Sequence, residues 1–144
     1  MRKQTAAALG AAALALPSVN AWAATQKATS KTRVVTATKS FTGAAATADR
    51  WGDVEVTIVV KKTTTTNLTT KKKTVKRKIT AVTVPVYPNH TDRSVYINRN
   101  ALPVLIQETI QAQSTAINLV SGASDTSQAF DQSLQSAILK AKAW

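Results

Sequence analysis

The sequence predicts an α+β fold: an antiparallel sheet with a long hairpin, partly covered by two helices. Apolar and polar residues alternate with a period of two in the first half of the chain, which is typical of half-buried strands. From residue 94 onward, apolar residues recur at the spacing of a helix face. The resulting order of strand, hairpin, helix, short strand and helix favours a sheet with helices on part of it.

The chain begins with the features of an export signal. Arg2 and Lys3 precede an apolar stretch over residues 6–16, and Ala21-Trp22-Ala23 has the small-x-small pattern of a cleavage site. The apolar stretch is too short to span a bilayer as a lasting anchor. The sequence therefore predicts a signal peptide over residues 1–23.

The rest of the chain is expected to form one extracytoplasmic domain. Residues 24–32 are small, polar and basic and predict a disordered lead-in, and residues 33–144 are long enough for one core. Cysteine is absent, which excludes a lipoprotein anchor and disulfides. The single histidine, His90, is interpreted as a loop residue, and no metal site or catalytic triad is predicted.

The strands follow from side-chain type and alternation. Residues 33–41 are rich in β-branched residues and predict a first strand, and residues 43–50 predict a loop. Residues 54–60 alternate as a half-buried strand should. Residues 79–86 predict its partner, with a change of phase near Ala81 that suggests a bulge.

Two helices and a short strand are expected in the second half. Turn formers at residues 87–92 end the strand pairing. Pro103 is expected to break or kink the start of the helix that follows. The apolar residues at 117–120 predict a short strand. The residues that predict the two helix faces are Ile97, Ala101, Leu105, Ile106 and Ile110, and then Phe130, Leu134, Ile138 and Ala141.

A basic run over residues 61–78 interrupts this pattern. It holds eight Lys or Arg, seven Thr and no acid, in a chain whose net charge is +12. Because Thr favours strands, the run predicts a long ribbon extending the hairpin. Two interpretations stay open: a solvated arm whose charge prevents aggregation, or a contact with an anionic membrane or cell-wall surface. Nucleic acid is not expected, because the arm lacks interleaved aromatic residues for stacking.

Residues 120–127 carry the pattern with the most chemical content. The segment Val-Ser-Gly-Ala-Ser-Asp-Thr-Ser places hydroxyls around a Gly-Ala pair where the last helix is expected to begin. A helix start has about four backbone N–H groups without partners and the positive end of the helix dipole. Small residues allow a ligand close to the backbone. The segment therefore predicts a phosphate-binding site.

At this segment the chain resembles the bacterial FMN-binding domain family, and in particular its small secreted members. The family signature is Ser/Thr-Gly-Ala-Thr/Ser followed by a hydroxyl-rich helix start. The resemblance extends in order from about residue 34 to residue 143, interrupted by the basic run. The segments that resemble the family are residues 51–56, 92–94, 97–98, 101–103, 107–109, 112–114 and 130–137.

The resemblance implies a flavoprotein. In relatives such as the flavin-carrying component of the sodium-translocating NADH:quinone oxidoreductase, a flavin transferase esterifies the FMN phosphate onto the last hydroxyl of the signature, which is Ser124 here. The same resemblance implies that Asn98 and Tyr87 contact the ribityl chain or the ring. It also implies that the phosphate pocket is shaped by Ser121, Gly122, Ala123, Thr126 and Ser127.

The function expected is that of an exported electron-transfer module with covalent FMN. Its implied partners are the flavin transferase and either redox proteins or quinone-linked membrane components. The chain is expected to be an electron carrier rather than an enzyme with its own substrate. The alternative is a cationic surface-binding protein on the same fold without flavin, and an exported hydrolase ranks third.

Overall fold

The computed structural model describes residues 31–144, so the predicted signal peptide and residues 24–30 of the predicted lead-in lie outside the described residues. The described chain divides into two compact units, residues 31–36 with 63–76 and residues 37–62 with 77–144. An antiparallel four-stranded sheet and two helices confirm the predicted α+β fold. The elements are β2 (Thr32–Thr42), β3 (Ala46–Thr47), the 3-10 helix η2 (Asp49–Trp51), β4 (Asp53–Asn67), β5 (Lys73–Val86), α3 (Asp92–Ala112) and α4 (Ser124–Lys142).

Strand β4 is the centre of the sheet, since β2, β3 and β5 all pair with it. The predicted long hairpin is present as β4 and β5. The predicted loop over residues 43–50 contains the two-residue strand β3, in which Ala46 lies opposite Val54 and Thr47 opposite Asp53. The Thr47 hydroxyl also donates to the Asp53 carboxylate at 3.1 Å, which fastens this short pair.

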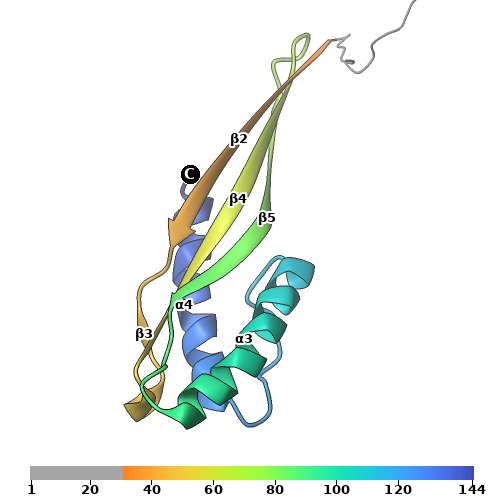
Figure 1. Cartoon of the computed structure of the whole chain (residues 1–144). Helices are drawn as coiled ribbons and strands as arrows, with labels where there is room; N and C mark the ends of the chain where they lie inside the picture. The colour runs from red at the N-terminus through yellow and green to blue at the C-terminus, as the bar shows by residue number, and fades with distance from the viewer. Residues whose placement is uncertain (1–30) are drawn as a thin grey trace, which may run out of the picture. The chain divides into compact units, whose positions relative to one another are not determined.

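The core lies in the larger unit and combines apolar residues of the sheet with those of α3 and α4. Every second residue of β4 from Val54 to Val60 is buried, as the alternation predicts. In the same unit, α4 lies along one face of the sheet (Figure 1). Its buried stripe meets this face and matches the predicted helix face, except that Ile138 is only partly buried and that Ala129 and Ala137 are also buried. The stripe consists of Ala129, Phe130, Leu134, Ala137 and Ala141.

Serine hydroxyls connect α4 to β4 and to the loop that follows β2 through hydrogen bonds. The Ser133 hydroxyl accepts the backbone N–H of Val56 at 2.9 Å, and the Ser136 hydroxyl accepts that of Ala44 at 3.0 Å. Gly43 lies so close to the helix that a Cβ added there would be 1.9 Å from the Ser133 carbonyl oxygen. Only a residue without a side chain fits this contact.

Helix α3 departs from the prediction in two respects. Pro103 lies inside the helix, which continues on both sides of it, so of the expected break or kink the break is wrong. Pro103 is exposed, and so is Arg99, the residue whose backbone carbonyl loses its N–H partner. Ile110 is exposed rather than buried, and the face is completed by Thr109, whose hydroxyl donates to the Leu105 carbonyl oxygen at 2.8 Å.

The short strand predicted over residues 117–120 is wrong. This segment has no strand structure and connects α3 to α4. Its apolar character comes from Ile117 and Val120, which are partly buried and pack against the core. A short apolar run is compatible with either a strand or a packed connecting segment, and the sequence alone does not distinguish these two structures. No helix among residues 31–144 is long and apolar enough to cross a membrane.

Candidate functional site

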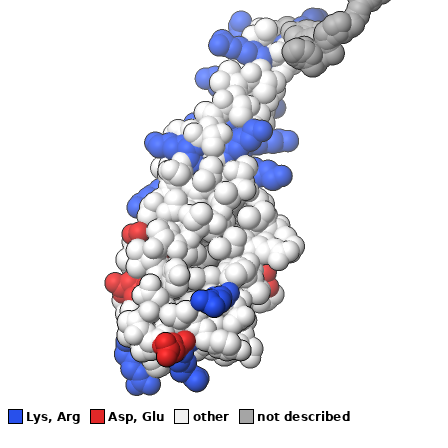
Figure 2. Space-filling model, viewed as in Figure 1, with Lys and Arg blue, Asp and Glu red and all other residues white. Residues whose placement is uncertain are grey.

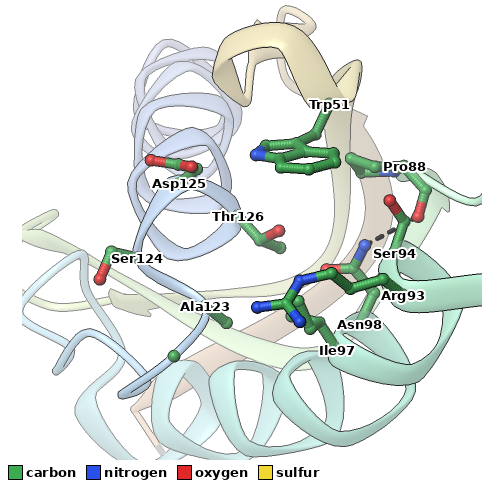
Figure 3. Close-up of a pocket in the computed structure, with 11 residues that line it drawn as sticks. Trp51, Pro88, Arg93, Ser94, Ile97, Asn98, Ala123, Ser124, Asp125 and Thr126 are labelled. Atoms are coloured by element: carbon green, nitrogen blue, oxygen red, sulfur yellow. Dashed lines mark hydrogen bonds between the residues drawn. The ribbon is translucent and has the colours of Figure 1, made fainter. Parts of the chain in front are cut away.

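The predicted helix start lies at a pocket of about 190 Å³ in the larger unit. Its wall combines the start of α4, the first turns of α3, Trp51 and Pro88 (Figure 3). The lining residues are Trp51, Pro88, Arg93, Ser94, Ile97, Asn98, Gly122, Ala123, Ser124, Asp125 and Thr126. The topology thus brings the signature segment together with residues about 30 and 70 positions earlier in the chain.

The start of α4 presents open backbone donors to this pocket. The N-cap is Ala123, which has no side chain to cap the helix, and the first helical bond runs from the Ser127 N–H to the Ala123 carbonyl oxygen at 2.9 Å. Among residues 31–144, the N–H groups of Ser124, Asp125 and Thr126 have no hydrogen-bond partner. Three such donors at the positive end of a 19-residue helix are the groups that an anion site requires.

The start of helix α3 is capped by a side chain, unlike the start of α4. Its N-cap Thr91 accepts the Ser94 N–H at 3.0 Å, so a side chain satisfies one of its terminal donors. The turn before α4 instead has Gly122 at φ +83°, a conformation that favours glycine. Because its N-cap is Ala123, the α4 start leaves open the donor that a polar N-cap side chain would occupy.

Asn98 contributes an unpaired acceptor to the same pocket. Its side chain is 1% exposed, and its Nδ2 donates to the Pro88 carbonyl oxygen at 2.7 Å. This bond fixes the amide, whose Oδ1 is buried and has no partner among the described residues. A buried acceptor without a partner costs about 1 to 3 kcal/mol. A ligand O–H or N–H at this atom would remove that cost.

Arg93 and Trp51 supply charge and a flat apolar wall. In Figure 3 the Arg93 guanidinium extends over the pocket beside Asn98, and the Trp51 indole forms the opposite side near Thr126. The Arg50 guanidinium carbon lies 5.2 Å from the centre of the Trp51 ring, a cation–π contact that helps to hold the indole in place. Sequence reasoning did not assign either Arg93 or Trp51 to the site, because only the fold brings them to the signature.

The predicted hydroxyls differ in their placement. Ser124 belongs to the lining and is exposed, and in Figure 3 its side chain points away from Arg93 and Asn98. Thr126 is 6% exposed and its side chain points into the pocket. Asp125 is exposed and belongs to the lining, and in Figure 3 its carboxylate points away from Arg93. Arg93, the one cationic side chain of the lining, is exposed as well, so water screens both charges.

Three other predicted site residues lie outside the lining. The Ser127 hydroxyl is buried, donates to the Ala123 carbonyl oxygen at 2.8 Å and accepts the Val120 N–H at 3.0 Å. It therefore fastens the turn that shapes the pocket. Ser121 is exposed in that turn, and Tyr87 lines a separate hollow beside Leu102.

Asp131 bears on stability rather than on the pocket. It lies on α4 outside the lining, and its Oδ1 is buried without a partner among residues 31–144. Burial raises the pKa of Asp131 above its usual value. A raised carboxyl pKa stabilises the fold only at acidic pH, and this contribution is lost as pH rises through the folded-state pKa.

The residues present fit the phosphate end of a flavin nucleotide. Open N–H donors and a guanidinium suit a phosphate, the Asn98 oxygen suits an O–H or N–H donor, and the Trp51 indole suits a flat ring. The pocket is smaller than the about 300 to 1,000 Å³ of sites that enclose whole ligands, so it encloses part of such a molecule. No protein-family model and no curated protein matches the chain.

Proposed function

We propose that this protein is an exported FMN-binding domain that carries electrons between partners outside the cytoplasm. The observation that carries the proposal is the uncapped start of α4, with three open N–H donors in a pocket shared with Arg93. The resemblance of residues 120–127 to the FMN-binding signature independently selects the same segment.

Each part of the pocket has a role in this proposal. The N–H groups of residues 124–126 and the Arg93 guanidinium hold the phosphate, because charge-assisted hydrogen bonds are the stronger ones. The Asn98 Oδ1 accepts a hydrogen bond from the ribityl chain or the ring, and Trp51 packs against the flavin. The bound flavin supplies the redox chemistry, and the protein supplies attachment and orientation.

Part of the flavin lies outside the pocket in this arrangement. The enclosed volume of about 190 Å³ takes only one end of FMN, and the rest is open to a partner. An exposed redox group suits transfer to or from another protein or a quinone-linked membrane component. The protein accordingly acts as a carrier rather than as an enzyme that encloses a substrate.

Ser124 is the proposed attachment point, and its exposed side chain turns toward the pocket when Arg93 holds the phosphate it carries. A hydroxyl that a second enzyme esterifies has to be accessible to that enzyme, and Ser124 is exposed whereas Thr126 is buried. Thr126 faces the pocket interior, where its hydroxyl contacts the phosphate without carrying the ester. In this proposal the Ser124 hydroxyl forms the covalent attachment, and the Thr126 hydroxyl contributes only non-covalent binding.

Loading of two single variants tests this assignment. Protein produced together with a flavin transferase is expected to gain the mass of one FMN less one water. Ser124→Ala should abolish this gain, because the attachment oxygen is removed, whereas Thr126→Val should retain it. Intact-mass spectrometry under denaturing conditions reports the covalent adduct alone. A gain retained in Ser124→Ala and lost in Thr126→Val would move the attachment to Thr126.

A further inference from the structure

The smaller unit has a strongly cationic surface and no buried residue. We call its described residues, 31–36 and 63–76, the basic ribbon. None of them is buried: residues 31–36 and 68–76 are exposed, and residues 63–67 are half-buried. The basic ribbon contains no acid, and its side chains include several of the Lys and Arg in Figure 2. Its cations are Lys31, Arg33, Lys71, Lys72, Lys73 and Lys76.

Large apolar side chains are exposed among these cations. Val34 is 60% exposed, Val35 48%, Leu68 46% and Val75 43%. Scattered apolar residues on a surface are ordinary, but here four of them share a small unit with six cations and no acid. If the cations served only to prevent aggregation of a strand edge, an exposed apolar side chain such as Leu68 near them would have no purpose.

The turn of the basic ribbon is held in shape by its own hydrogen bonds. The Asn67 side-chain oxygen accepts the N–H groups of Thr69 and Thr70, both at 2.9 Å. The Asn67 N–H donates to the Lys72 carbonyl oxygen at 2.9 Å, and the Leu68 N–H donates to the Lys31 carbonyl oxygen at 2.6 Å. Leu68 and the three lysines at 71–73 are therefore presented on an ordered turn, which reduces the entropy lost on binding.

We propose that the basic ribbon docks on the surface of an anionic lipid bilayer. Its lysines meet the lipid phosphates, and Leu68 enters the boundary between headgroups and acyl chains. This combination distinguishes a bilayer from a soluble polyanion, since a polyanion offers phosphate or carboxylate charge without an apolar layer for Leu68. The proposal concerns a different unit from the flavin pocket and holds whether or not flavin is bound.

Vesicle co-sedimentation with the whole protein tests the charge requirement. The protein is expected to bind vesicles of equal parts phosphatidylglycerol and phosphatidylcholine and to dissociate from them as the salt concentration rises. It should not bind vesicles of pure phosphatidylcholine. Lys72→Thr with Lys73→Thr should weaken binding about thirtyfold, from the loss of two near-surface cations. The matched control, Arg99→Thr with Lys142→Thr, removes two exposed cations of the larger unit and should bind as the parent does.

A probe at position 68 tests the apolar contact. Because the chain has no cysteine, Leu68→Cys provides one labelling site for an environment-sensitive dye. The emission of this dye should shift to the blue on anionic vesicles, and that of the same dye at the exposed position of Gln135→Cys should not. Circular dichroism and thermal unfolding check that each variant is folded.

Three outcomes would overturn the proposal. The first is the absence of binding to anionic vesicles in dilute buffer. The second is equal weakening by the ribbon variant and its control, which would show an effect of net charge alone. The third is binding with no emission shift at position 68, together with equally tight binding to dextran sulfate, which would assign the basic ribbon to anionic polymers. Flavin content, measured by absorbance, should be the same in all these variants.

Discussion

Gly43→Ala is expected to destabilise the protein by about 3 kcal/mol, at the upper end of the range for overpacking. An added Cβ would lie 1.9 Å from the Ser133 carbonyl oxygen and 2.8 Å from its carbonyl carbon, which are backbone atoms inside α4. Neither can move without shifting the helix away from the strands. Thermal unfolding should show a Tm lower by about 10 °C or more.

A substitution two residues away is the control for Gly43. Ala45 is exposed, so Ala45→Val adds more side-chain volume at a position where nothing opposes it. It should change the Tm by less than about 2 °C. A Gly43→Ala protein with the Tm of the parent would show that α4 does not approach the backbone at Gly43.

Leu134→Ala is expected to lower the free energy of unfolding by about 2 to 5 kcal/mol and to reduce flavin content in the same protein. Leu134 is fully buried in the contact between α4 and the sheet. Because the first turn of α4 holds the proposed phosphate donors, loosening the helix also disorders the pocket. Chemical unfolding and flavin absorbance per protein measure the two effects.

Gln135→Ala is the control for Leu134, since it lies next along α4 and is exposed. It should change both stability and flavin content little, because exposed substitutions away from special contacts usually alter stability by less than about 0.5 kcal/mol. If Leu134→Ala had reduced stability but normal flavin content, flavin binding would not depend on the packing of α4.

The fold was predictable where side-chain periodicity is strong and packing follows it. The alternation on β4 and the spacing of Phe130 and Leu134 on α4 predict the core correctly. The failures occur where one local pattern allows two structures. Residues 117–120 are as apolar as a strand but form a packed connection, and the exposed Pro103 is accommodated within α3.

The pocket was predictable only in part. The small residues at 122–123 predict an approachable helix start, and the structure has this helix beginning at Ser124. The uncapped N–H groups depend on Ala123 being the N-cap, a boundary that sequence does not fix to one residue. Arg93 and Trp51 reach the site only through tertiary packing, so no local sequence pattern predicts their part in it.

A titration with two flavins tests the central claim most directly. Protein produced without a flavin transferase is titrated with FMN and with riboflavin, which lacks the phosphate, and binding is followed by flavin fluorescence. FMN should bind at one site, and riboflavin about a hundredfold more weakly, because two charged hydrogen bonds or more are lost at about 1.5 kcal/mol each. Arg93→Ala should weaken FMN about tenfold and leave riboflavin unchanged, whereas Arg99→Ala should affect neither. Equal affinity for both flavins, or none for FMN, would contradict a phosphate-binding flavin site at the start of α4.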